Sequence, residues 1–172
     1  LAVAVPLAAV VAPPPAAAVG VIGNAFVWLD SEDASMCLVP AEHQWNSYWT
    51  GPVNMICSEE PGYYTVYLPG LAASAGTVQV TAYGEDAAYC KVISWGPEGT
   101  DQRIRVLCLG PTGAPVGSRF TLSYTNQSAA GGTPLAYLYA SQPTSASYTP
   151  PMNYQYNSAG GTVMVAKPAG TT

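Results

Sequence analysis

Four cysteines carry the most specific chemistry in this 172-residue sequence, because paired thiols form disulfides in an oxidising compartment. They are Cys37, Cys57, Cys90 and Cys108. No two of them have the C-x-x-C spacing of a zinc site, and His43 is the only histidine. We therefore expect two disulfides, no metal and no cofactor, in an extracellular or cell-surface protein.

Strand register selects one of the three possible disulfide pairings. If residues 96–103 form the loop of a β-hairpin, Trp95 faces Arg103, and Cys90 then falls directly opposite Cys108. The remaining pair is Cys37 with Cys57. On the chain-entropy model, a bridge that closes a loop of about 20 residues stabilises a fold by roughly 3 kcal/mol.

A dense aromatic stretch, residues 43–49, could bind sugar. Apolar sugar faces stack on indole and phenol rings, and neighbouring amides bind the hydroxyls. Trp45, Tyr48 and Trp49 are the candidate platform for a glycan, which makes a glycan a possible partner. The same ring types also pack β-sheet cores and protein interfaces, so that interpretation stays open.

Few groups could perform acid–base catalysis. His43 is the one imidazole, and the G-x-S-x-G turn of a serine hydrolase is absent from the sequence. The acidic run of Asp30, Glu32 and Asp33 could form a weak calcium loop, although a solvated turn is the commoner role of such residues. We do not expect an enzyme, and a hydrolase that depends on His43 ranks last among the hypotheses.

The charge content excludes further classes of protein. Five Lys or Arg and ten Asp or Glu make 9% of the residues, against roughly 25% in an ordinary soluble domain. A charged helical bundle does not fit this composition, and five scattered cations at a net charge of −5 do not make a track for nucleic acid. Disorder does not fit a hydrophobic content of 49%.

Short strand-like segments separated by Gly and Pro dominate residues 24–126. Their spacing and alternation predict an all-β protein with an antiparallel β-sandwich, Ig-like or barrel-like. The expected strands are residues 26–29, 63–68, 77–83, 90–95, 104–109 and 119–124.

Residues 1–23 are uncharged and apolar, and three interpretations compete for them. A targeting segment would need a basic start, and Pro6 with the Pro13-Pro14-Pro15 run would break a transmembrane helix, so we expect no membrane span in the mature chain. The favoured interpretation is an extended apolar arm. Its candidate assembly residues are Val3, Val5, Leu7, Val10 and Val11.

After a Gly/Ser-rich linker at residues 127–134, the sequence repeats itself. Gln44-Trp45-Asn46-Ser47 matches Gln155-Tyr156-Asn157-Ser158 at an offset of 111, and residues 26–29 align with residues 136–139 at an offset of 110. Residues 135–172 are thus a partial second repeat. Either it is truncated, or its strands complete a sheet in the same or a neighbouring subunit. At the start of the linker, Asn126-Gln127-Ser128 is a sequon for N-glycosylation.

Several of these segments resemble a repeat found in uncharacterised secreted bacterial proteins. The residues that carry the resemblance are the run from Gly76 to Gly84, Cys90 to Pro97, Val106-Leu107-Cys108 and Ser118 to Thr121. The resemblance implies a secreted β-rich module, often in tandem, and it implies no catalytic residues.

Two functions follow from these features. The first is an extracellular structural protein, a subunit of a self-assembling filament or surface layer held by strand exchange, with the apolar arm added to an open sheet of a neighbour. The low charge would reduce repulsion between the subunits of such a homopolymer. The alternative is a secreted carbohydrate-binding module that uses the aromatic platform.

Overall fold

The computed structural model describes residues 23–31, 37, 39–48, 54–126 and 135–167. The predicted arm residues Val3, Val5, Leu7, Val10 and Val11 lie outside these ranges, as do the predicted linker and Trp49. The arm and its role therefore stay predictions.

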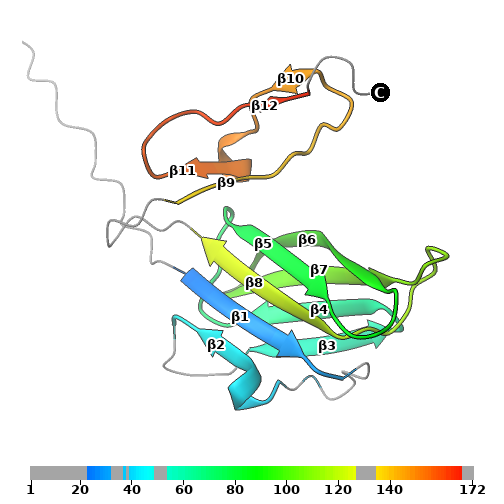
Figure 1. The fold of residues 1–172 in the computed structure, drawn as a ribbon. Helices are drawn as coiled ribbons and strands as arrows, with labels where there is room; N and C mark the ends of the chain where they lie inside the picture. Colours follow the sequence, from blue (N-terminus) through cyan, green and yellow to red (C-terminus); the bar gives the residue numbers. More distant parts are fainter. Residues whose placement is uncertain (1–22, 32–36, 38, 49–53, 127–134, 168–172) are drawn as a thin grey trace, which may run out of the picture.

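Two four-stranded antiparallel sheets pack face to face (Figure 1), which confirms the predicted all-β sandwich. The first sheet has the order β2-β1-β8-β5, and the second has the order β3-β4-β7-β6. The bounds are β1 (Gly23–Leu29), β2 (Gln44–Asn46), β3 (Met55–Glu60), β4 (Tyr63–Leu68), β5 (Thr77–Ala82), β6 (Tyr89–Glu98), β7 (Asp101–Leu109) and β8 (Phe120–Asn126).

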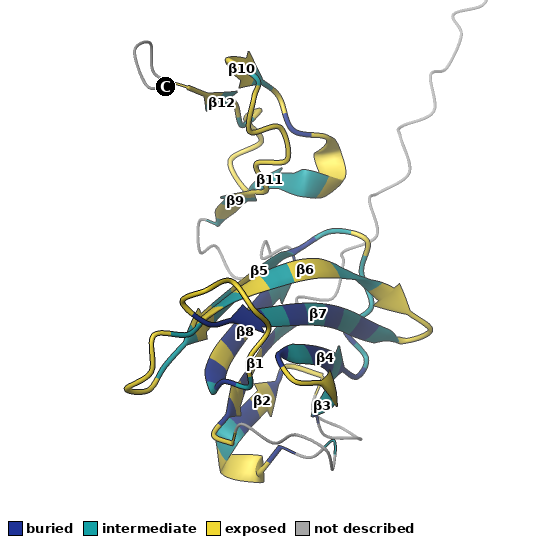
Figure 2. Cartoon of the chain, turned by 90° about the vertical axis from the view of Figure 1, so that its right-hand side faces the viewer, coloured by how far each residue is buried: buried dark blue, intermediate teal, exposed yellow. Residues whose placement is uncertain are grey.

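Period-two alternation builds the core between the sheets (Figure 2). In β8, Phe120, Leu122 and Tyr124 are buried, whereas the intervening side chains face outward. Strand β7 supplies Ile104 and Val106 from the other sheet, both with no exposed surface. Strands β7 and β8 thus each turn one apolar face to the core and keep the other face for other contacts.

The first and last strands of the sandwich are neighbours. All seven residues of β1 pair with β8, from Gly23 opposite Asn126 to Leu29 opposite Phe120. In an Ig-like sandwich the first and last strands belong to different sheets, so this strand order is not the Ig-like one. The first sheet is therefore complete only when β8 has paired with β1 on one side and with β5 on the other.

Both predicted disulfides are present, Cys37–Cys57 and Cys90–Cys108. Cys90 pairs with Cys108 across β6 and β7 as expected, but the register near the turn was predicted wrongly. Trp95 lies opposite Ile104, because the turn is the tight Gly99-Thr100 pair and Gly99 has φ +61°. A β-bulge between Val92 and Ser94 removes the one-residue difference before the strand reaches Cys90.

The prediction also missed two strands, β2 and β3. Residues 44–46 were not among the expected strands, yet β2 pairs with β1, and Gln44 and Asn46 point into the sandwich. Buried hydrogen bonds satisfy them: Asn46 Nδ2 donates to Asn54 Oδ1 at 2.9 Å, and Asn54 N donates to Gln44 Oε1 at 2.7 Å. Amide side chains thus occupy the inward positions of β2, where a strand of a sandwich usually has apolar ones. The sequence of β2 therefore lacks the apolar alternation by which a strand is recognised.

The C-terminal segment forms two small two-stranded sheets beyond the end of the sandwich (Figure 1). They are β9 (Ala136–Leu138) with β11 (Gln155–Asn157), and β10 (Ser147–Tyr148) with β12 (Val165–Ala166). The ring of Tyr139 contacts Trp95 edge-on at 5.2 Å, which ties this segment to β6.

The β9–β11 pair reproduces the β1–β2 pair residue by residue. Gln155 lies opposite Leu138, as Gln44 lies opposite Val27. Leu138 comes 111 residues after Val27, and Gln155 comes 111 residues after Gln44. Leu138 is therefore the structural counterpart of Val27, and the offset of 110 predicted for this strand was wrong by one residue.

Candidate functional site

Three aromatic rings lie side by side on the outer face of the first sheet. Trp45 of β2 lies directly opposite Phe26 of β1, a pairing that places side chains about 5 Å apart. Trp28 follows Phe26 on the same face, about 7 Å further along β1. All three rings are exposed, at 46%, 44% and 37% for Trp45, Phe26 and Trp28. We call this group the aromatic row.

Trp28 is held in a fixed orientation by its neighbours. His43, at the end of the 3-10 helix η1 (Ala41–His43), stacks on the indole with ring centroids 4.2 Å apart. The Trp28 Nε1–H donates to the Tyr83 hydroxyl, which itself donates to Asp30 Oδ1 at 2.6 Å. Burial, and then the hydrogen bond to Asp30, raise the pKa of Tyr83, so its hydroxyl stays a donor. A ring fixed before binding loses little conformational entropy when a ligand stacks on it.

Hydroxyl and amide side chains continue the aromatic row across the sheet. The cross-strand pairs put Ser123 and then Gln79 beside Phe26, and Thr121 and then Thr81 beside Trp28. Six outward-facing residues of these strands, with the backbone neighbours Val27 and Leu122, line a shallow depression of about 350 Å³. Rings at one side and hydrogen-bonding groups at the other suit a ligand that has both apolar faces and hydroxyls.

None of the described residues that line this depression is charged. Two charged side chains lie around Tyr83, the hydrogen-bond partner of Trp28: Asp30 accepts from its hydroxyl, and Arg119 lies over its ring at 5.5 Å. A surface without charges offers an ionic ligand no Coulomb attraction, whereas stacking and hydrogen bonding to an uncharged ligand need no charge. The arrangement therefore suits an uncharged ligand.

The predicted platform is only partly assembled. Trp45 belongs to the aromatic row, but the Tyr48 ring lies against Gly70 at the end of β4, where an added Cβ would meet it at 2.1 Å. Trp49 lies outside the described residues. His43, the only candidate imidazole, serves as a stacking partner of Trp28. Phe26 and Trp28 were missed, although their i, i+2 spacing in an alternating strand could have indicated a shared face.

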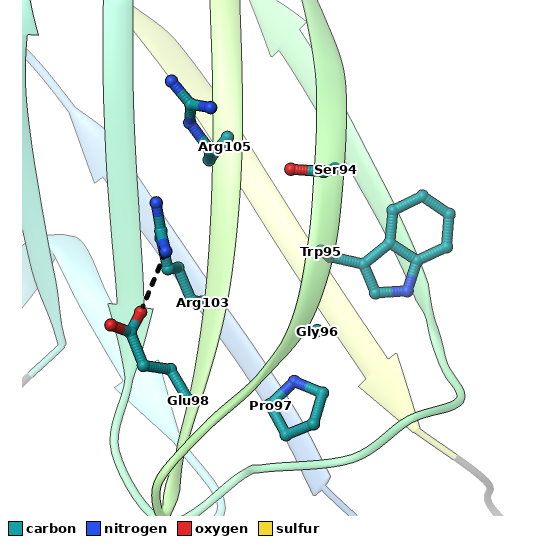
Figure 3. Close-up of a pocket in the computed structure, with 7 residues that line it drawn as sticks. All are labelled: Ser94, Trp95, Gly96, Pro97, Glu98, Arg103 and Arg105. Atoms are coloured by element: carbon teal, nitrogen blue, oxygen red, sulfur yellow. Dashed lines mark ion pairs between the residues drawn. The ribbon is translucent and has the colours of Figure 1, made fainter.

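A second depression, of about 510 Å³, lies over β6 and β7 on the outer face of the other sheet (Figure 3). Arg103 forms an ion pair with Glu98 at 3.3 Å, and Arg105 forms one with Glu59 at 3.4 Å. The Thr65 hydroxyl, followed by the Arg105 charge, lowers the pKa of Glu59. Since each arginine has its own carboxylate, this depression carries little net charge for a ligand to meet.

The other sites suggested by the sequence are not formed by the described residues. They contain no cluster of three metal-ligating side chains, and Glu32 and Asp33 of the suggested calcium loop lie outside them. Asn126 of the sequon is 8% exposed, and its Oδ1 accepts a hydrogen bond from Gly23 N at 2.6 Å. In the folded chain this amide is therefore closed to a glycosyltransferase.

Of the residues that the structure describes, none belongs to a helix of the length and apolarity that a bilayer span requires. The two disulfides fit an oxidising compartment. Protein-family models, curated proteins and solved structures contain no match to this chain, so the resemblance to a secreted repeat stays a prediction.

Proposed function

We propose that this protein is a secreted, non-catalytic module that binds neutral glycan chains on the outer face of its first sheet. The observation that carries the proposal is the aromatic row of Trp45, Phe26 and Trp28 beside an uncharged border of hydroxyl and amide groups. Pyranose rings have apolar faces that stack on such rings and equatorial hydroxyls that bind such a border.

Binding of soluble, uncharged oligosaccharides tests this proposal, with tryptophan fluorescence and calorimetry as readouts. Trp45→Ala removes the ring at the β2 end of the aromatic row and is expected to weaken binding about tenfold, because a stacked aromatic contact contributes about 1–2 kcal/mol. Tyr89→Ala is the matched control, since Tyr89 is 50% exposed on β6 of the other sheet. Equal effects of the two substitutions, or no binding to any neutral glycan, would contradict the proposal.

A second candidate function is the self-assembling extracellular structural protein predicted from the sequence. One observation favours it: β9 copies β1, yet β9 has no counterpart of β8 among the residues that the structure describes. An open strand edge of this kind accepts a strand from another molecule. Light scattering and electron microscopy of the full chain, with and without residues 1–22, test for a homopolymer and for the role of the arm.

A further inference from the structure

The depression on the first sheet lies along β8, because short side chains line it there. Thr121 and Ser123 of β8 lie between the rings of β1 and the side chains of β5. An indole and a phenyl ring extend further from a sheet than a hydroxyl side chain does, so Trp28 and Phe26 rise along one side of the depression. A ligand there would lie along β8 with one face against β1.

Only one face of the Trp28 indole is turned to such a ligand. His43 stacks on the indole with an angle of 31° between the ring planes, and it directly precedes β2. Since β2 and β8 flank β1 on opposite sides, the imidazole covers the face toward β2. The face toward β8 remains, and the hydroxyls of Thr121 and Thr81 follow it across the sheet. A pyranose ring stacked on that face would turn its hydroxyl edge toward these two side chains.

Tyr83 crosses the end of the depression next to Trp28. It directly follows β5, where its backbone N donates to Arg119 O at 3.1 Å. On the β1 side, its hydroxyl donates to Asp30 Oδ1 at 2.6 Å and accepts from Trp28 Nε1. Strands β5 and β1 lie about 10 Å apart, two strand spacings with β8 between them, so the phenol ring spans the strand in between. This end of the depression is therefore closed by a ring that is held on both sides.

The opposite end has no such barrier among the described residues. The next row of outward-facing side chains past Phe26 is Asn24, Thr125 and Thr77. All three residues are partly buried, and the Thr125 hydroxyl donates to Asn24 Oδ1 at 2.7 Å, which holds both side chains low on the sheet. A ligand that lies along β8 can therefore extend beyond the depression in this direction, whereas Tyr83 blocks the other.

We infer that this site takes the terminal pyranose unit of a neutral glycan chain, stacked on Trp28, and that Tyr83 excludes the interior of the chain. The inference deepens the proposed function and rests on it. An interior unit is linked to a neighbour at each end, and one of these neighbours would occupy the space of the Tyr83 ring. A terminal unit has a single linkage, which would point past Thr125.

The number of protein molecules bound to each glycan chain tests the inference on the unsubstituted protein. The probes are short and long linear gluco-, manno- and xylo-oligosaccharides, all uncharged, and calorimetry gives the stoichiometry. The two ends of such a chain differ chemically, so we expect one protein molecule per chain at every length, with a dissociation constant per chain that does not change. Several protein molecules on each long chain would overturn the inference and keep the proposed function. No binding to any probe would overturn both.

Substitutions at Tyr83 separate a closed end from a merely well-ordered Trp28. Tyr83→Ala removes the ring and should raise the number of protein molecules on each long chain above one. Tyr83→Phe keeps the ring and should leave one per chain, as should Tyr89→Ala on the other sheet. The same stoichiometry for Tyr83→Ala and Tyr83→Phe would overturn the barrier. A Tyr83→Ala protein that binds no probe would also overturn it, because the ring would then act by positioning Trp28.

Discussion

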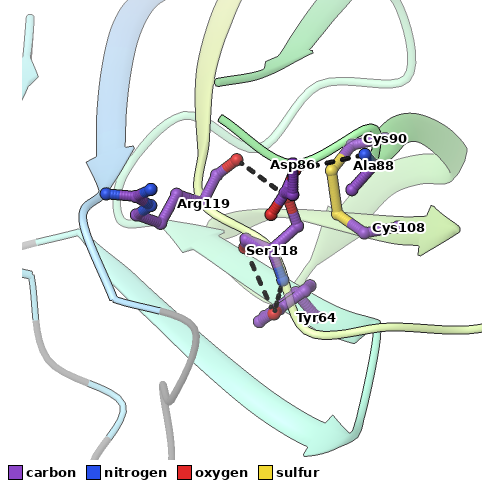
Figure 4. Close-up of a disulfide and its surroundings, with 7 residues drawn as sticks. All are labelled: Tyr64, Asp86, Ala88, Cys90, Cys108, Ser118 and Arg119. Carbon is purple, nitrogen blue, oxygen red and sulfur yellow. Dashed lines mark hydrogen bonds between the residues drawn. A yellow bond between two sulfur atoms is a disulfide. The ribbon is translucent and has the colours of Figure 1, made fainter. Parts of the chain in front are cut away.

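The substitution Tyr64→Phe removes one hydroxyl from the centre of the sandwich and nothing else. Tyr64 is 1% exposed, and its hydroxyl accepts a hydrogen bond from Ser118 N at 3.0 Å and donates to Ser118 O at 3.3 Å (Figure 4). These bonds fasten the loop before β8 to β4 in the opposite sheet. The Phe ring keeps the edge contact with Phe120, whose centroid lies 5.2 Å away.

The expected cost is that of a buried amide without an acceptor. Because Ser118 has no exposed surface, water cannot replace the lost oxygen, and the free energy of unfolding should fall by about 1–3 kcal/mol. With an m-value of about 2 kcal/mol/M, the urea midpoint should fall by about 1 M.

Equilibrium urea unfolding with the disulfides intact measures this change. The matched control is Tyr63→Phe on the same strand, since Tyr63 is partly exposed and faces outward, and its cost should stay within about 0.5 kcal/mol. If both variants unfold at the same urea concentration, the assigned role of the Tyr64 hydroxyl is refuted.

Three further changes have defined outcomes. Gly70→Ala should destabilise the fold by about 1–3 kcal/mol in thermal unfolding, because φ is +75° there and the new Cβ would meet the Tyr48 ring. Deletion of Ile93 should leave the Cys90–Cys108 bridge intact by mass spectrometry, because the bulge disappears while the flanking pairs keep their partners. Burial raises the pKa of Tyr124 in the folded chain, so this hydroxyl ionises more easily when the chain is unfolded. The free energy of unfolding should therefore fall as the pH rises above about 10. A urea midpoint that does not change between pH 9 and pH 11 would contradict that cause.

The sequence predicted the parts of the fold that depend on simple alternation. Strand β8 alternates apolar and hydroxyl side chains, and the Cys90–Cys108 pair follows from a hairpin. Strand β2 was missed because Gln44 and Asn46 point into the core, where buried amides bind each other. No local pattern distinguishes such residues from those of a polar loop.

The candidate site was predicted in part for a related reason. Nearness along the chain groups Trp45 with Tyr48, whereas pairing between strands groups it with Phe26, nineteen residues earlier. The sheet decides which rings share a face, and its order depends on contacts between distant segments. Trp45 was therefore identified correctly as a candidate, and its actual neighbours were not.

The position of β8 has a consequence for the order of folding. Strands β3 with β4 and β6 with β7 form two local hairpins, so each hairpin, and the Cys90–Cys108 disulfide within the second, can assemble from nearby residues. The first sheet must wait for β8, whose Asn126 pairs with Gly23 across 103 residues. A chain that emerges N-terminus first would thus hold β1 and β5 without their shared partner β8 until residue 126 is free. That delay is the one interval in which the amide of Asn126 is open to modification, and in which an exposed β1 could pair with the β8 of a neighbouring chain.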